Sequence, residues 1–111
     1  MGIVIIRDKV QASDIKVASQ EYGNYIKIVA DIGRRIIAIG GQWHADAEKM
    51  LLEDGSDQKD LWGGGIDTTS KNIETIAMIN VRPNMNNNSQ EILNEKIRND
   101  FVDIVKEKFN I

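Results

Sequence analysis

The amino-acid sequence predicts an α+β fold, in which residues 1–111 form a single domain with three helices and a mostly antiparallel five-stranded sheet. The predicted element order is β-α-β-β-α-β-β-α. Two pairs of apolar segments, each pair joined by a short turn, alternate with period two and indicate two β-hairpins. Segments with helical apolar spacing precede, separate and follow these hairpins. Consecutive hairpins make a sheet antiparallel, and the helices are expected to pack on one of its faces.

The first two elements are a short strand and a helix. Residues 3–6 (Ile-Val-Ile-Ile) are a continuous β-branched run, which indicates a buried strand. Ser13 and Asp14 offer an N-cap for a helix over residues 13–22. Gly23 offers this helix a left-handed C-terminal cap.

The first hairpin joins residues 25–32 to residues 36–39. Apolar residues occupy every second position from Ile26 to Ile32, so this strand is predicted to be half-buried. The second segment is apolar on both faces and is therefore expected at the centre of the sheet. Gly33 is expected to adopt a positive φ in the tight turn between them.

The remaining segments predict two more helices and a second hairpin. A run of good helix formers over residues 43–54 ends at Gly55. The second hairpin turns at residues 67–70, and its second strand alternates over residues 73–81. Residues 94–109 carry an apolar stripe at helical spacing, which predicts the last helix.

Composition narrows the classes of function. The chain has no cysteine and one histidine, which excludes disulfides, zinc fingers, iron–sulfur clusters and thiol catalysis. The net charge of -3 and the pI near 5.1 weigh against a nucleic-acid partner. No apolar run approaches the ~20 residues of a membrane span, and residues 3–6 are too few for a signal peptide core. We therefore expect a soluble protein of the cytoplasm.

The rarest residue types of the chain gather in one segment, residues 40–67. Both tryptophans, the one histidine and six of the nine glycines lie there, among clustered aspartates and glutamates. Proteins commonly display functional groups on loops that a rigid scaffold positions. We therefore expect the functional site in this segment.

The same segment carries a family resemblance. Its pattern G-G-x-x-H-A-D…L-L-x-D-G-S-x-Q-x-D-L-W-G, with residues 79–83 (Ile-Asn-Val-Arg-Pro) and 89–92 (Ser-Gln-Glu-Ile), resembles a small uncharacterised prokaryotic family. That family is known as a domain of unknown function. The resemblance covers nearly the whole chain and implies no activity for it.

One hypothesis for the segment is a divalent metal site. Its candidate ligands are His44, Glu48 and Asp57, and the first two are four residues apart on one face of a helix. One imidazole combined with carboxylates suits Mg, Mn or Fe better than structural zinc. The alternative is structural, because acidic residues in a first helical turn complement the helix dipole.

A second hypothesis is acid–base catalysis by His44, because the pKa of histidine near neutrality suits proton transfer. Asp46 or Asp60 would orient the imidazole. The serine nucleophile pattern Gly-x-Ser-x-Gly is absent, so a nucleophilic serine is not expected. The alternative is that the lone histidine is a structural or surface residue.

A third hypothesis is a ligand-binding surface. Gly64 lies in a run of three glycines whose backbone N–H groups suit a phosphate, with Arg82 as an anion contact beside Asn80. Trp43 and Trp62 are candidates for the walls of a pocket. The alternative is that the glycines permit close packing and the tryptophans complete the core.

Together these features favour a small-molecule binding site or a simple hydrolytic site around residues 44–67, assisted by a divalent metal. The rival hypothesis is a non-enzymatic interaction protein, which would form homo-oligomers or bind through a tryptophan-lined surface. Convergence of His44, Asp57 and Asp60 in one cleft, with Trp62 on its wall, would favour the site.

Overall fold

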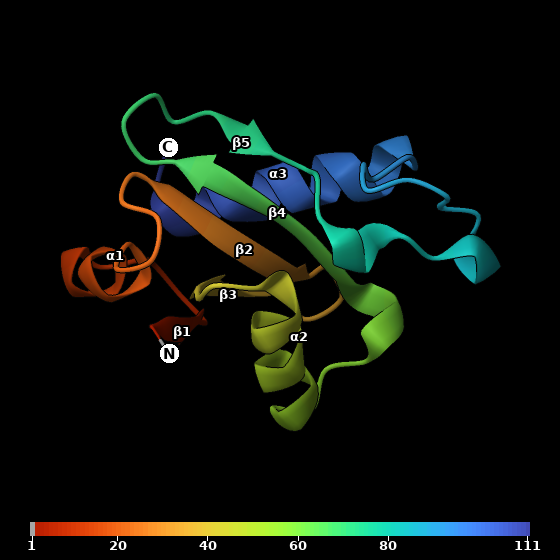
Figure 1. The fold of residues 1–111 in the computed structure, drawn as a ribbon, viewed down its shortest axis with the longest axis horizontal. Helices are drawn as coiled ribbons and strands as arrows, with labels where there is room; N and C mark the ends of the chain where they lie inside the picture. Colours follow the sequence, from red (N-terminus) through yellow and green to blue (C-terminus); the bar gives the residue numbers. More distant parts are fainter. Residues whose placement is uncertain (1) are drawn as a thin grey trace.

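A computed structural model describes residues 2–111 of the chain and confirms the predicted α+β fold (Figure 1). Five strands form one antiparallel sheet in the order β1-β3-β2-β4-β5. The elements, in chain order, are β1 (Ile3–Ile6), α1 (Ala12–Ala18), β2 (Tyr25–Asp31), β3 (Ile36–Gly40), α2 (His44–Glu53), β4 (Leu61–Asp67), β5 (Ile73–Glu74) and α3 (Glu95–Phe109). Short 3-10 turns cover Gln58–Asp60, Met78–Asn80 and Pro83–Met85.

The helices cover both faces of the sheet, so the prediction that they share one face is wrong. On one face, Phe101 and Ile104 of α3 pack with Ile28 of β2 in the larger apolar core. On the other face, Leu51 of α2 packs with Val29 of β2 in a second, smaller core. Figure 1 shows α3 behind the sheet and α2 in front of it. The physical reason is that the central strands β2 and β3 bury consecutive residues, which leaves two apolar surfaces to cover.

The first hairpin is confirmed, but its turn works differently from the prediction. Positive φ occurs at Arg35 (φ 55), and Gly33 has no positive φ. A Cβ added at position 33 would stand 2.8 Å from Oδ2 of Asp60, so a larger residue there would require the Asp60 side chain to move. Asp31 at the end of β2 closes the turn, since its Oδ1 accepts hydrogen bonds from the backbone N–H groups of Gly33 and Arg34 at 2.9 Å.

The second hairpin is also confirmed, although β5 is much shorter than the predicted strand over 73–81. Only Ile73 and Glu74 pair with β4. Beyond them the chain makes one isolated bridge, between Ile76 and Glu91, and then the 3-10 turn that ends at Asn80. The first helix differs as well, because α1 begins after Gln11 and ends at Ala18.

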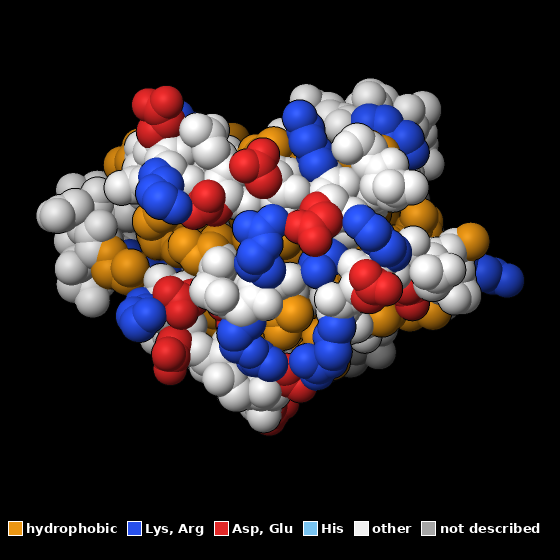
Figure 2. Space-filling view, turned by 180° about the vertical axis from the view of Figure 1, so that it is seen from behind, with side chains coloured by type: hydrophobic (Ala, Val, Ile, Leu, Met, Phe, Trp, Pro, Cys, Tyr) orange, Lys and Arg blue, Asp and Glu red, His pale blue; other side chains and the backbone are white. Residues whose placement is uncertain are grey.

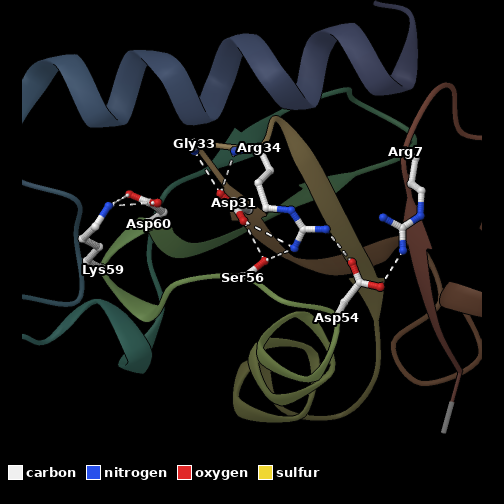
Figure 3. Close-up of polar contacts among 8 residues, drawn as sticks. All are labelled: Arg7, Asp31, Gly33, Arg34, Asp54, Ser56, Lys59 and Asp60. Carbon is white, nitrogen blue, oxygen red and sulfur yellow. Dashed lines mark hydrogen bonds and ion pairs between the residues drawn. The ribbon is translucent and has the colours of Figure 1, made fainter.

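A buried carboxylate network fastens the end of α2 to the sheet (Figure 3). Asp31 is fully buried, and its Oδ2 accepts a hydrogen bond from the hydroxyl of Ser56 at 2.6 Å. Arg34 donates to Ser56 at 2.8 Å and to Asp54 at 2.7 Å, and Arg7 pairs with Asp54 at 2.6 Å. This network fixes where the chain leaves α2 and turns toward β4.

The outer surface over α3 carries charges of both signs. Figure 2 shows Lys and Arg side chains interspersed with Asp and Glu on this face, with small apolar areas between them. Within residues 2–111, no helix combines the length and the apolar character needed to cross a membrane.

Candidate functional site: a groove at the start of helix α2

A groove of about 680 Å³ lies where helix α2 begins. Four segments line it: Tyr25 and Lys27 of β2, residues 43–45 at the start of α2, Glu74 and residues 76–79 in and after β5, and Gln90. The short β5 therefore has a consequence for function, because the chain that leaves it forms one wall of the groove.

The glycines of β4 make room for the side chains around this groove. A Cβ on Gly63 would lie 2.6 Å from Ala77 and 3.2 Å from Cδ2 of His44, and a Cβ on Gly65 would meet the hydroxyl of Tyr25. Gly64 faces the opposite side of the sheet, where a Cβ would lie 2.7 Å from the ring of Phe101. The three positions are thus occupied by the protein's own side chains, which supports the packing alternative over a phosphate cradle.

His44 lies in the first turn of α2 and faces β4. Its Nε2 lies 2.6 Å from the carbonyl oxygen of Gly64. Because a carbonyl only accepts, Nε2 carries the proton and donates it, which leaves the lone pair on Nδ1. Burial lowers the pKa of His44, and the nearby ammonium of Lys27 lowers it further, against the opposing effect of the Gly64 hydrogen bond. The imidazole is therefore a neutral acceptor at the edge of the groove.

Lys27 is held between two tyrosine rings. Its Nζ lies 4.4 Å from the ring centroid of Tyr22 and 5.7 Å from that of Tyr25, at cation–π distances. The pKa of the Tyr25 phenol is raised by burial and by the nearby carboxylate of Glu74, so the hydroxyl stays protonated. The groove thus contains one ammonium, one carboxylate and one phenol.

The wall of the groove is apolar and unusually exposed. Trp43 is 61% exposed, Ile76 is 48% exposed and Met78 is 69% exposed. Scattered single apolar side chains are normal on protein surfaces, whereas three around one cavity make this groove a candidate site of interaction. Trp43 is one of the predicted pocket walls, and the structure places it there.

The second predicted wall, Trp62, belongs to the larger core instead. It is 1% exposed, and the guanidinium of Arg82 stacks on its ring at 4.8 Å. Arg82 also donates to the carbonyl oxygens of Ile79 and Gln58 and pairs with Glu48 at 3.2 Å. Its donors are engaged by the protein, so the structure gives it a packing role and does not bring it into the groove.

Asn80 is a structural residue. It is fully buried, and its side-chain oxygen accepts from the N–H of Gly63 at 2.8 Å, while its amide donates to the carbonyl oxygens of Gly63 and Gln90 at 2.9 Å. The side chain thereby pairs with β4 as a strand residue would, beyond the point where β5 ends.

The predicted acidic ligands do not converge on His44. Within residues 2–111, no group of three His, Asp or Glu side chains is placed to hold one metal ion, so the trio of His44, Glu48 and Asp57 does not form. Asp60 lies near Gly33 and pairs with Lys59 at 3.1 Å (Figure 3), while Asp46 lies in the first turn of α2 outside the lining of the groove. The turn at Gln58–Asp60, which follows the anchored Ser56, carries Asp57 and Asp60 away, while Glu48 pairs with Arg82.

Sequence reasoning missed most of the groove. Of the site residues that the sequence predicted, only Trp43 and His44 line the groove. Lys27, Glu74 and Met78 also line it and were not among the predicted residues. A signal was present, because the segment after residue 73 carries large apolar residues on both of its alternating faces. Such a pattern is inconsistent with an edge strand that has one face in water.

Fold and site define a class: an α+β domain whose antiparallel sheet is covered on both faces and carries a groove where one helix begins. The chain belongs to the family described as "Protein of unknown function (DUF5674)", whose model matches residues 4–108. This confirms the resemblance seen in the sequence. Comparison with curated proteins and with solved structures gave no match.

Proposed function

We propose that the protein binds a small molecule in the groove beside Trp43 and His44. The observation that carries this proposal is the groove itself, because a cavity of about 680 Å³ lies within the range of small-molecule sites. Such sites are mostly apolar and hold a few polar groups that fix orientation. Trp43 and Met78 supply the apolar surface, and the neutral imidazole of His44 supplies an acceptor.

Binding is better supported than hydrolysis. Among the described residues, no serine, threonine or cysteine lines the groove, so covalent catalysis has no such nucleophile there. His44 stands without a carboxylate to orient it, since its Nε2 is bonded to the carbonyl of Gly64. The proposal is therefore a binding module in which His44 positions the ligand.

A direct test uses indole, a neutral planar probe that is able to stack on Trp43. We expect indole to raise the melting temperature increasingly as its concentration rises and to give saturation-transfer NMR signals with the wild-type chain. Trp43→Ala should weaken binding about tenfold, which corresponds to ~1.4 kcal/mol of lost stacking and burial. Leu93→Ala is the matched control, because Leu93 is also exposed but lies outside the groove.

The proposal fails if neither indole nor a free amino acid binds, or if Trp43→Ala binds indole as well as Leu93→Ala does. The rival hypothesis is that the protein forms homo-oligomers through this surface, and the exposed side chains of Trp43, Ile76 and Met78 are also compatible with that role. The oligomeric state in solution tests this hypothesis. A dimer that becomes monomeric on Met78→Glu would show that a second copy covers the groove. Light scattering of the wild-type protein and of the Met78→Glu variant distinguishes these outcomes.

A further inference from the structure

Two unpaired charges of opposite sign flank the centre of the groove. In the register of the sheet, Lys27 of β2 lies opposite Gly65 of β4, and Gly65 lies opposite Glu74 of β5. The three residues therefore form one row across the sheet, and both charged side chains line the groove. Two interstrand spacings separate the outer Cα atoms by roughly 9–10 Å.

These two charges do not neutralise each other or any other side chain. Arg7, Arg34, Arg35 and Arg82 each have an acidic partner within 4.0 Å, whereas Lys27 and Glu74 belong to no ion pair among residues 2–111. Glycine at position 65 makes room for the ring and hydroxyl of Tyr25, which lie over that glycine, and the phenol also interacts with the carboxylate of Glu74. The row thus presents an ammonium, a phenol and a carboxylate in sequence.

We propose that the ligand of this groove is a small zwitterion with an apolar substituent, of the free α-amino acid type. Its carboxylate would bind the ammonium of Lys27, its ammonium would bind the carboxylate of Glu74, and its apolar group would pack on Trp43. This inference rests on the proposed function and specifies its ligand class.

Charge complementarity favours this class over singly charged ligands. An anion on Lys27 would lie beside the carboxylate of Glu74, and a cation on Glu74 would lie beside the ammonium of Lys27, so each would meet one like charge. Lys27 is also pre-positioned by the rings of Tyr22 and Tyr25, which reduces the entropy lost on binding.

The test is calorimetric titration of the full chain with phenylalanine, leucine and methionine, and with two phenylalanine derivatives. Phenylalaninamide lacks the carboxylate and N-acetylphenylalanine lacks the ammonium. We expect phenylalanine to bind, because its ring is able to pack on Trp43, and each derivative to bind at least tenfold more weakly than phenylalanine.

Variants assign each charge to its partner. In Lys27→Gln, phenylalanine should lose its advantage over phenylalaninamide, and in Glu74→Gln it should lose its advantage over N-acetylphenylalanine. Lys49→Gln and Glu53→Gln are the matched controls, because both residues are exposed on α2 outside the groove. They should leave every affinity unchanged.

The zwitterion proposal is overturned if indole binds but none of the three amino acids does, or if either derivative binds as tightly as phenylalanine. It is also overturned if the Lys27 and Glu74 variants keep the wild-type preferences. In those cases the groove still binds a small molecule, and only the ligand class is wrong. Failure of indole and of all amino acids would instead overturn the proposed function itself.

Discussion

Replacing Asn80 with alanine should destabilise the fold strongly, although the residue belongs to no regular element longer than a 3-10 turn. Three short hydrogen bonds join its side chain to Gly63 and Gln90. Each contributes roughly 1 kcal/mol net, and a buried N–H left without a partner costs about 1–3 kcal/mol. Asn80→Ala removes all three bonds and leaves the N–H of Gly63 unpaired inside the protein. We expect a loss of about 3–5 kcal/mol in the free energy of unfolding.

Urea denaturation followed by circular dichroism measures this loss, since the midpoint falls while the slope stays constant for a two-state change. Asn84→Ala provides the control, because Asn84 is exposed in the neighbouring turn and should change stability by less than ~0.5 kcal/mol. A loss below about 1 kcal/mol for Asn80→Ala would refute the reasoning, because it would mean that water or a rearranged chain satisfies Gly63 equally well.

Two further predictions concern β4 and His44. Gly64→Ala should lower the free energy of unfolding by at least ~3 kcal/mol, measured by urea denaturation, because the new Cβ meets Phe101 and the backbone of Glu74. Gly23→Ala is the control: Gly23 has φ +63 with open space around it, so this change should cost only about 1–2 kcal/mol. Equal losses for the two variants would contradict the packing argument. In an NMR titration, the imidazole of His44 should show a pKa below its ordinary value of 6.5. At pH values above that pKa, the neutral ring should be the Nε2–H tautomer. Because the pKa of His44 is lower in the folded chain than in the unfolded chain, the unfolded chain binds a proton at a higher pH. The free energy of unfolding should therefore fall as the pH drops through 6.5, and this fall should be smaller in His44→Gln.

The fold was largely predictable because its determinants are local in sequence. Alternating apolar residues from Ile26 to Ile32 specify a strand whatever lies beyond them, and the stripe along residues 94–109 specifies a helix. The arrangement of layers was less accessible. It depends on β2 burying both Ile28 and Val29, and the burial of consecutive residues becomes visible only when the strand order is known.

The site was less predictable than the fold, because its residues come from four distant segments. His44 and Trp43 stood out through their rarity, which is a property of composition. Lys27 and Glu74 look like ordinary solvent-facing strand residues, and only the register through Gly65 places them in one row. Asn80 appeared to be a surface group at a strand end, because its role depends on β5 stopping at Glu74.

The glycines of β4 let the side chains of Tyr25, His44 and Ala77 lie close against the sheet where they line the groove. This part of the lining tolerates little change, whereas the rim consists of exposed residues such as Ile76 and Met78 that belong to neither core. Substitution at the rim should therefore change which molecules fit at little cost in folding stability. A scaffold of this kind separates the part that must stay constant from the part that is free to diversify.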